Sequence, residues 1–258
     1  MQDINNLDTL NNLYKKGYVI IEGVFNSDQI KELHKPLKLE RYSKYIRSSL
    51  NMRGFKTKKN ITDYLKYLNS QTVNEKIIKN TKKIFETTNF FKNKMKYFSN
   101  IDWNALRVNV PNDKYKNVHW HQDIQTPLEN KQDFYKNKFF TFWIPFTSVS
   151  EKNSIEILPY SNKNIVFNNH YRKDIPIPKI YKKNKSIKVK INAGDLVILD
   201  NFTFHKSILN TSKLLRISVD LRYSNNKSCN LKIHYRLKSR IIFESVKGFL
   251  KYDIIKIK

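Results

Sequence analysis

The N-terminal part of the chain has apolar residues at helical spacing, interrupted by one short apolar run. Three leucines, three residues apart, share one face of a predicted helix over residues 7–14. Gly17 ends this helix, and the apolar run at 18–21 is typical of a buried strand. Asn26, with Gln29 three residues later, predicts a capped start for a second helix.

The pattern changes twice further along the chain. Residues 36–70 are polar and weakly patterned, so we expect irregular structure there. Thr72 followed by Glu75 resembles a capping box, and apolar residues from 77 to 85 then fall on one helical stripe. From about Trp103 onward the pattern of apolar runs and turn residues is typical of short strands. The predicted strands are residues 105–110, 138–145, 154–158, 187–191, 196–199 and 214–223.

Helices first and many short strands afterwards predict an α+β fold with a mainly β core. The strands are expected to form a barrel or sandwich, supported by a layer of mostly N-terminal helices. No internal repeat is visible, and 258 residues suit a single domain of this type. We expect one domain over 1–258, divided into helical support (1–100), a β core (101–225) with an insertion (160–190), and a C-terminal extension (226–258).

The chain is strongly basic, with 49 Lys+Arg, 22 Asp+Glu and a net charge of +27. Such a charge is typical of proteins that bind nucleic acid or anionic surfaces. However, only nine of the basic residues are arginine, whose bidentate fork is favoured in nucleic-acid grooves. A/T-rich codons also produce a composition rich in lysine and asparagine and poor in alanine. We favour this second explanation and expect no nucleic-acid partner.

Other features of the composition bear on class and location. With 40% hydrophobic residues the chain can bury a core, which excludes a disordered basic tail. The longest nearly apolar run, residues 139–146, is shorter than the roughly 20 residues needed to cross a bilayer. The N-terminus has no basic-then-apolar leader, and the single Cys229 cannot form an internal disulfide. These features predict a cytoplasmic protein.

Two of only six histidines lie close together in the segment 118–123, Val-His-Trp-His-Gln-Asp. In a strand, His121 and Asp123 would point the same way and could converge on one ion, with His119 on the same face. A histidine and a carboxylate at this spacing make two thirds of the facial triad that binds non-haem Fe(II). His205, which follows a predicted turn and apolar strand, fits as the distant third ligand.

A strand with strict alternation follows eleven residues later. Leu215, Ile217, Val219 and Leu221 alternate with Arg216, Ser218, Asp220 and Arg222. In an ordinary half-exposed strand the polar face would lie in solvent. In a barrel strand packed under helices, Arg216 and Ser218 would instead point inward, where a guanidinium and a hydroxyl suit a carboxylate. The position after a candidate metal ligand favours the second interpretation.

Together these motifs resemble the phytanoyl-CoA dioxygenase-like (PhyH-like) family of Fe(II)- and 2-oxoglutarate-dependent oxygenases. The resemblance is carried by Trp120-His-Gln-Asp123, Phe142-Trp-Ile-Pro-Phe146, Asn153-Ser-Ile-Glu-Ile-Leu-Pro159, and Gly194-Asp195 leading to His205 and Arg216. Order and spacing match from about residue 105 to residue 223, and the opening at 17–21 is also similar.

The resemblance implies a double-stranded β-helix (jelly-roll, cupin-like) core and a set of site residues. These are His121, Asp123 and His205 as iron ligands, with Arg216, Ser218 and Trp143 around 2-oxoglutarate. Fe(II), 2-oxoglutarate and O₂ are the implied cofactors. The implied reaction is hydroxylation of an unactivated C–H bond with release of succinate and CO₂. Asp123 retains the carboxylate that related halogenases lose, although desaturation or ring formation would use the same residues.

The chain departs from the family at two motifs. Members usually have Asn-Gly and Pro-Gly-Ser-His where this chain has Asn153-Ser154 and 159–162, Pro-Tyr-Ser-Asn. The altered rim bears on the substrate rather than on the metal. The family gives His119 no ligand role, so we expect it to support the ligands or face the substrate, with a purely structural role as the alternative.

A lysine-rich segment at 171–190 bears on the substrate. It has eight basic residues and one acid, and lies in the expected insertion. We favour a solvated loop in a lysine-rich chain; the alternative is a flap for a small anionic substrate such as a CoA ester, a sugar nucleotide or a glycan precursor. The tail at 233–258 predicts a helix packed on the core, with weak peripheral membrane contact as the alternative. Oligomeric state is left open.

Three rival classes compete with the oxygenase. The first is a zinc metallo-hydrolase with an H-x-H-x-D-H motif, but residue 124 is isoleucine rather than histidine. The second is a cupin, but the expected glutamate is absent from 125–127, Gln-Thr-Pro. The third is a basic binding module with an inactive oxygenase fold. Metal content separates the three from the oxygenase.

Overall fold

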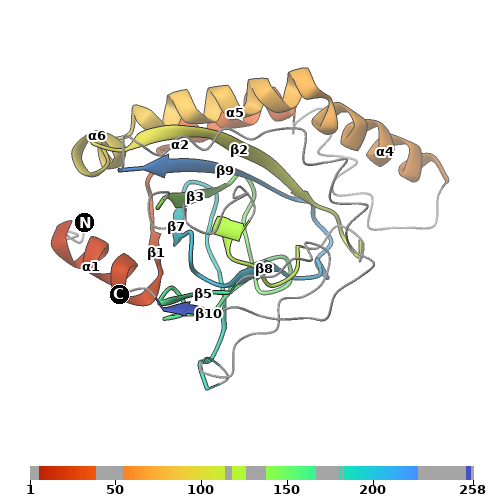
Figure 1. Ribbon diagram of the computed structural model, residues 1–258. Helices are drawn as coiled ribbons and strands as arrows, with labels where there is room; N and C mark the ends of the chain where they lie inside the picture. Colours follow the sequence, from red (N-terminus) through yellow and green to blue (C-terminus); the bar gives the residue numbers. More distant parts are fainter. Residues whose placement is uncertain are drawn as a thin grey trace, which may run out of the picture.

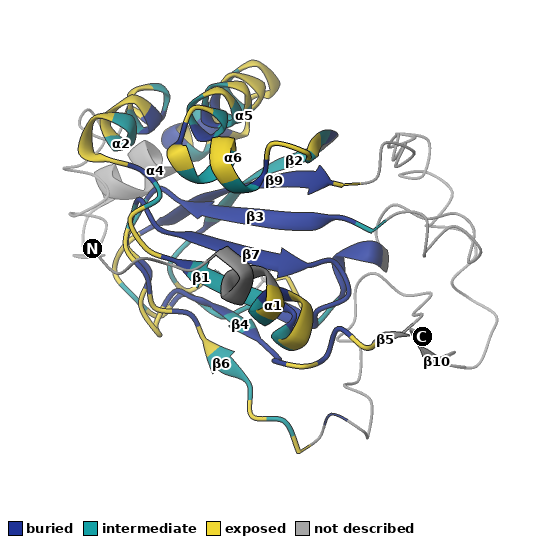
Figure 2. Ribbon diagram, turned by 90° about the vertical axis from the view of Figure 1, so that its left-hand side faces the viewer, coloured by how far each residue is buried: buried dark blue, intermediate teal, exposed yellow. Residues whose placement is uncertain are grey.

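Helices and two facing sheets are arranged in layers. The computed structural model describes residues 6–38, 55–113, 118–125, 138–166, 181, 183–225 and 254–256. Within these residues, helices cover one face of a five-stranded antiparallel sheet, and a three-stranded antiparallel sheet lies on its other side (Figures 1 and 2). The described residues therefore form a mixed helix and sheet fold, as the element order predicts.

Three of the described helices confirm predicted helices: α1 (Asn6–Lys16), α2 (Ser27–His34) and α5 (Gln71–Glu86). The N-terminal part also contains a 3₁₀ turn η1 (Lys35–Leu37), α4 (Phe55–Asn69) and α6 (Asn89–Lys94). The capping box at α2 is present, since the Asn26 side chain accepts from the backbone N–H of Gln29 at 2.9 Å and the Gln29 side chain accepts from that of Asn26 at 3.0 Å.

Two sequence predictions for this region are wrong. Residues 55–69 form α4 rather than irregular structure. The polar composition hid the pair Tyr64 and Leu68, which lie one turn apart and are fully buried. The next helix, α5, begins at Gln71 after the N-cap residue Ser70, which makes no side-chain cap, so the predicted capping box at Thr72 does not exist.

Three antiparallel sheets contain the described strands. The five-stranded sheet has the order β1 (Tyr18–Ile21), β7 (Leu196–Asp200), β3 (Phe140–Pro145), β9 (Arg216–Ser224) and β2 (Ser99–Asn109). The three-stranded sheet has the order β6 (Ile187–Lys188), β4 (Ile155–Ile157) and β8 (His205–Ser207). β10 (Ile254–Lys256) pairs with β5 (Asn164–Val166). The strand predicted at 18–21 is confirmed with the same bounds and the other predicted strands with different bounds, whereas β5, β8 and β10 were not predicted.

The two faces of the five-stranded sheet have different surroundings. On the helix side, Phe142 of β3, Ile198 of β7 and Val219 of β9 belong to a core with Leu33, Ile77 and Phe85 of the helices. On the other side, a smaller core joins both sheets. It contains Trp143, Val149, Ile155, Ile157, Val189, Ile191, Val197 and Leu199.

Strand β9 settles the orientation of its polar face. All nine of its residues are buried. Its apolar residues Ile217, Val219 and Leu221 pack on the helix side. The alternating polar residues therefore point into the interior between the two sheets, not into solvent, because successive strand residues face opposite ways. The interpretation of an ordinary half-exposed strand is wrong.

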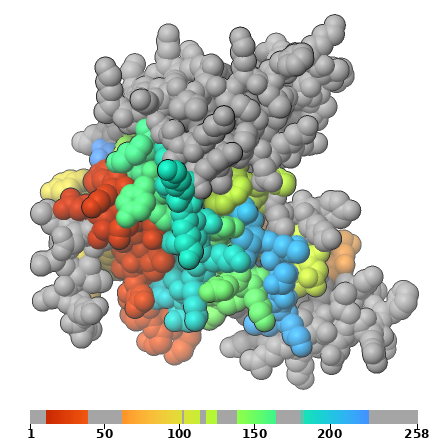
Figure 3. All heavy atoms as spheres, turned by 90° about the horizontal axis from the view of Figure 1, so that it is seen from below, coloured from red at the N-terminus to blue at the C-terminus, as the bar shows by residue number. Residues whose placement is uncertain are grey.

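A closed jelly-roll barrel is not found among the described residues, whose strand pairings form separate sheets. On the face seen in Figure 3, atoms of the N-terminal segment lie beside atoms of residues near 181–200, in agreement with the pairing of β1 with β7. None of the described helices is long and apolar enough to span a bilayer.

Gly17, directly before β1, packs closely against the turn that follows β7. Its φ is +84°, and a Cβ there would overlap Thr203 Oγ1. The Gly17 carbonyl accepts from this same hydroxyl at 2.7 Å and from the Asp200 N–H at 2.9 Å. Gly17 thus fixes the turn that precedes His205.

Replacing Gly17 by alanine is expected to lower the free energy of unfolding by about 2–4 kcal/mol, because the left-handed backbone and the overlap both add cost. Urea unfolding measures this. Gly23→Ala is the matched control, since its φ is +64° but no atom lies within 4 Å of the added Cβ. It should lose only about 1 kcal/mol, and equal losses in the two variants would contradict the overlap.

Candidate metal centre and pocket

Backbone pairing brings the two candidate histidines together. The N–H of His121 donates to the carbonyl of His205 at 3.0 Å, and the reverse bond is also 3.0 Å. Asp123, two residues on, opens the 3₁₀ turn η2 (Asp123–Gln125). The segment is thus one isolated bridge followed by a turn rather than the straight strand expected from sequence, yet its side chains converge. The donor atoms of His121, Asp123 and His205 all lie within 4.8 Å of one another.

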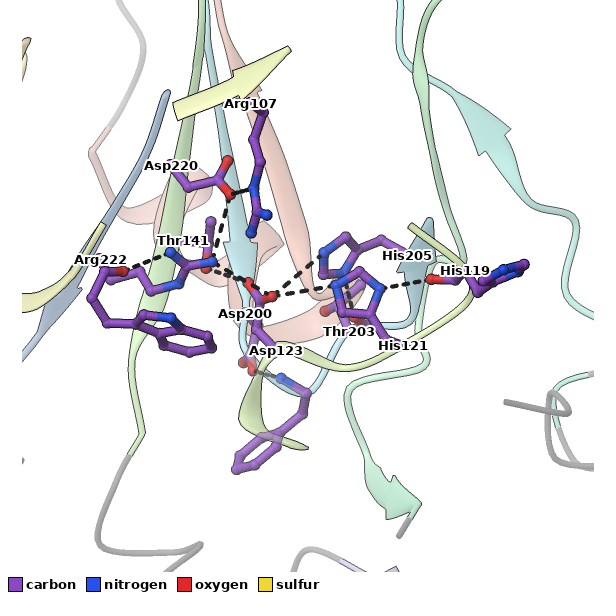
Figure 4. A network of polar contacts seen from close by, with 12 residues as sticks. Arg107, His119, His121, Asp123, Thr141, Asp200, Thr203, His205, Asp220 and Arg222 are labelled. Atoms are coloured by element: carbon purple, nitrogen blue, oxygen red, sulfur yellow. Dashed lines mark hydrogen bonds and ion pairs between the residues drawn. The ribbon is translucent and has the colours of Figure 1, made fainter. Parts of the chain in front are cut away.

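Each imidazole ring is oriented by a backbone carbonyl. Nδ1 of His121 donates to the carbonyl of His119 at 2.8 Å, and Nδ1 of His205 donates to that of Thr203 at 3.0 Å. Both Nε2 atoms then carry a lone pair and face Asp123 Oδ1, at 3.5 Å and 3.8 Å (Figure 4). Such anchoring of the second nitrogen is typical of histidines that bind metals.

The Asp123 carboxylate is buried and surrounded by donors and cations. Burial by itself would raise the pKa of Asp123, but the charge of Arg222, together with His205 and His121 when they are protonated at acid pH, holds it well below its usual value. Thr141 of β3 donates its hydroxyl to Oδ2. Arg222 Nη2 lies 3.8 Å from Oδ1. The carboxylate is therefore ionised at neutral pH and held in one orientation.

The protonation of His205 also suits a ligand. Burial, followed by the charge of His121, lowers the pKa of His205 to about 4. A neutral imidazole and an ionised carboxylate are the forms that bind a metal. Two imidazole nitrogens and one carboxylate oxygen match the donor set of the non-haem Fe(II) facial triad, so these residues fit that ion.

The low pKa of His205 predicts a pH dependence of stability in the metal-free protein. The unfolded chain takes up this proton below about pH 6.5, and the folded chain only below about pH 4. Between these values the unfolded state binds more protons, so the free energy of unfolding falls as the pH falls, by at most about 3 kcal/mol.

Urea unfolding of the metal-free protein at pH 7 to 4.5 measures this effect, above the range where Asp123 titrates. A His205→Gln variant should lose that part of the slope. Parallel profiles for the wild type and the variant would show that His205 is not the group responsible.

The pocket beside the triad also contains Arg216. It encloses about 440 Å³ of empty space, including the part open to solvent, and among the described residues Arg107, Trp143 and Asp220 also line it. Arg216 is 3% exposed, and its Nη1 donates to the carbonyls of Asn153 and Ser154 at 3.2 and 3.0 Å. Its Nε has no hydrogen-bond partner among the described residues.

Arg216 remains a cation inside the protein. Burial lowers its pKa to about 10, against the effect of Asp220, so the guanidinium is charged at neutral pH. The anchored Nη1 leaves Nε and Nη2 as one edge of the rigid fork. That edge suits a carboxylate.

The other two candidate residues lie next to Arg216. The Arg216 guanidinium carbon is 5.5 Å from the centre of the Trp143 ring, in a cation–π arrangement. Trp143 Nε1 donates to Ser218 Oγ at 2.9 Å. Trp143 lines the pocket, whereas Ser218 is fully buried behind it and does not line it. The structure thus brings five of the six candidates to one pocket and places the sixth beside it.

A polar network around Asp220 supports this site, and the sequence suggested only one of its contacts, the pair of Asp220 and Arg222, with substrate contact as the alternative. Arg107 Nε donates to Asp220 Oδ2 at 2.8 Å, and Arg222 Nη2 lies 3.5 Å from the same oxygen. Arg222 in turn approaches Asp123, so the chain of charges runs continuously into the triad (Figure 4). The alternation of β9 placed Asp220 and Arg222 on the inward face, but no spacing signal pointed to Arg107 or Thr141.

Most of the chain matches the sequence model of a known family. The sequence model of the family described as Phytanoyl-CoA dioxygenase (PhyH) matches residues 13–218. The chain belongs to this family. The predicted cofactors agree with the PhyH family and with the triad. The search of curated proteins returned no match.

Solved structures share the fold at low sequence identity. The epimerase SnoN from a complex with Fe³⁺, alpha ketoglutarate and nogalamycin RO is similar with a TM-score of 0.52 and 13% identity, over 84% of this chain and 82% of that chain. The non-heme monooxygenase ThoJ in its apo form gives 0.51 and 13%, over 83% and 75%. These similarities support the same fold for the described sheets and helices.

Both departures from the PhyH motifs lie within the described residues. Tyr160 replaces the usual glycine yet has a φ of 62°, the left-handed region that favours glycine. At the other motif, Asn153 and Ser154 supply the two carbonyls that hold Arg216. His119 is exposed, and its carbonyl orients His121. The first of the roles considered for His119, support of a ligand, is thus carried by its backbone.

Other predictions lie mostly outside the described residues. Of the basic segment at 171–190, residues 171–180 and 182 are not described. Of the C-terminal tail, only β10 is described, and it is a strand paired with β5 rather than part of the predicted helix.

Proposed function

We propose that this protein is an Fe(II)- and 2-oxoglutarate-dependent oxygenase that hydroxylates an unactivated C–H bond of a small anionic metabolite and releases succinate and CO₂. The observation that carries the proposal is the buried cluster of His121, Asp123 and His205, with both Nε2 atoms facing the carboxylate. Arg216 in the same pocket supports it. Membership of the PhyH family and the fold shared with SnoN and ThoJ agree with this assignment.

Each residue has a role in the proposed reaction. His121, Asp123 and His205 hold iron, and Thr141 and the carbonyls of His119 and Thr203 fix the ligand orientation. Arg216 binds the 5-carboxylate of 2-oxoglutarate through Nε and Nη2, with Trp143 lying against the guanidinium. Ser218 positions Trp143 through its hydroxyl. Iron with 2-oxoglutarate and O₂ supplies the oxidising power, and the protein supplies binding and orientation.

The sequence supports further parts of the proposal. We assign the chain as one oxygenase domain with a double-stranded β-helix core, as in the PhyH resemblance. We also propose a cytoplasmic location, which the cysteine content favours, and the second role considered for the basic segment at 171–190, a flap whose positive charge would attract an anionic substrate.

A spectroscopic experiment tests the metal and the co-substrate together. Anaerobic addition of Fe(II) and 2-oxoglutarate to the wild type is expected to give a weak visible charge-transfer band, and His121→Ala should abolish it because a ligand is lost. His34→Ala is the matched control, since His34 lies in α2 and interacts with the Phe146 carbonyl. It should keep the band.

The rival classes give other results. Copurified zinc with no band in the wild type would support a metallo-hydrolase and contradict the oxygenase. If the band forms, release of succinate coupled to consumption of a candidate anionic metabolite tests the reaction. Mass analysis of the product then distinguishes hydroxylation, a gain of one oxygen, from desaturation or ring formation.

A further inference from the structure

Arg107 points into the pocket from β2, a strand that carries none of the residues assigned to the proposed reaction. It lies on β2, opposite Ser218 of β9, so its side chain shares a face with the inward residues of that strand. Arg107 lines the pocket together with the triad and Arg216. Figure 4 shows its guanidinium between Asp220 and the side chains of Asp123 and His205.

The hydrogen bonding of Arg107 leaves its two Nη groups available to a ligand. Nε donates to Asp220 Oδ2 at 2.8 Å. Within the part of the chain that the structure describes, its two Nη groups make no hydrogen bond. The side chain is 41% exposed, whereas that of Arg222, the other arginine at Asp220, is 1% exposed. Arg107 is therefore the member of this network that a ligand can reach.

Charge balance in the pocket points to an acidic ligand. The described residues that line it include the cations Arg107, Lys206 and Arg216 and the anions Asp123 and Asp220. Lys206 pairs with Glu156 at 3.2 Å, outside the lining. Fe(II) and doubly charged 2-oxoglutarate together add no net charge. Arg222, which lies outside the lining, contacts both Asp220 and Asp123. Arg107, Arg216 and Arg222 therefore exceed the two carboxylates by one positive charge, and Arg107 presents it to the pocket.

We infer that Arg107 is a carboxylate-binding residue, so that the pocket accepts an acidic group beside the triad as well as the one at Arg216. The two Nη groups of a guanidinium hold one carboxylate bidentately. The carboxylate comes either from carbon 1 of 2-oxoglutarate or from the primary substrate, and the experiment below separates these sources. The inference rests on the proposed function and extends it.

Calorimetry on Mn(II)-loaded protein under anaerobic conditions tests the first source. The probes are 2-oxoglutarate and 2-oxobutyrate, which share the 1-carboxylate but differ at the far end. If Arg107 binds that carboxylate, Arg107→Gln raises the dissociation constants of both acids by a similar factor of about 10 to 100. This is the range for losing a hydrogen bond to a charged group. Lys31→Gln, an exposed residue of α2, is the charge-matched control and should change neither affinity.

Proton relaxation tests the second source, with acetate added to Mn(II)-loaded protein saturated with 2-oxoglutarate. If the carboxylate belongs to the substrate, Mn(II) broadens the acetate methyl signal in the wild type and in Lys31→Gln, and Arg107→Gln removes the broadening. Arg107→Lys keeps the charge but loses the two parallel N–H donors of the guanidinium. It should therefore give an intermediate loss of acid affinity, or an intermediate loss of acetate broadening, in the experiment in which Arg107→Gln has an effect.

The outcomes separate this inference from the proposed function. Unchanged affinities for both acids together with unchanged acetate broadening in Arg107→Gln overturn the role of Arg107. Failure of the wild type to bind Mn(II) or Fe(II) overturns the proposed function instead. The melting temperature and the Mn(II) affinity of Arg107→Gln are measured first, so that a folding defect is recognised. Arg107→Lys then carries the test if Arg107→Gln does not fold.

Discussion

Replacing Arg222 by methionine is expected to lower the free energy of unfolding of the metal-free protein by about 3–5 kcal/mol. Arg222 is fully buried, and its Nη2 lies 3.5 Å from Asp220 Oδ2 and 3.8 Å from Asp123 Oδ1. Its Nη1 donates to the Trp103 carbonyl at 2.6 Å, and the guanidinium lies 4.0 Å from the Trp103 ring centre. Methionine fills similar space but leaves two buried carboxylates without this cation.

Urea unfolding of a matched pair of variants measures this effect. Arg107→Met removes a cation from the same Asp220, but that side chain is 41% exposed. Its pair is therefore screened by water, and its loss should cost less than about 1 kcal/mol. Similar losses in both variants would show that burial of the charge does not set the cost.

The sequence was sufficient to predict which three residues, His121, Asp123 and His205, come together in a cluster that could hold a metal ion. His121 and Asp123 are near neighbours, and a short local stretch brings them together. His205 and Arg216 have a fixed separation in the family motif, so their positions follow from the resemblance. The alternation in 215–223 also predicted which side chains face inward, because strand geometry has a strict period of two.

The partners of these residues depend on strand register, which local patterns do not encode. The pairing of β2 with β9 shifts between Ile101, opposite Arg222, and Ala105, opposite Asp220. This irregularity places Arg107 opposite Ser218 and thereby next to Asp220. Without it Arg107 would lie opposite Arg216, two residues before Ser218 in β9, and no local pattern in the sequence of this segment indicates the shift.

The missed helix α4 has a similar cause. Its fit to the fold depends on distant contacts, because Tyr64 OH donates to the Leu37 carbonyl and Tyr67 OH to the Pro36 carbonyl, at 2.9 and 2.8 Å. The helix has few apolar residues, so its periodicity is weak, and tertiary packing rather than pattern stabilises it. Prediction from sequence therefore succeeded where chemistry is local and failed where long-range contacts select the structure.

The largest effect on co-substrate binding is expected from Arg216→Gln. This change removes a buried guanidinium from the pocket lining, so the dissociation constant for 2-oxoglutarate should rise about 100-fold, as for loss of a buried charged hydrogen-bond partner. Mn(II) affinity should stay close to that of the wild type, since Arg216 makes no contact with the triad in the described residues. Calorimetry on the Mn(II)-loaded protein measures both quantities.

Comparison of two acids shows whether Arg216 acts on the far carboxylate. The wild type should bind 2-oxoglutarate much more tightly than 2-oxobutyrate, which lacks the 5-carboxylate, and Arg216→Gln should bind both with similar weak affinity. Lys152→Gln, at an exposed cation beside Asn153, is the control and should keep the preference. Arg216 also anchors the carbonyls of Asn153 and Ser154. General loosening of that turn would therefore lower the affinity for both acids by the same factor and leave the preference for 2-oxoglutarate unchanged. A preference that survives in Arg216→Gln would therefore show that another residue holds the 5-carboxylate.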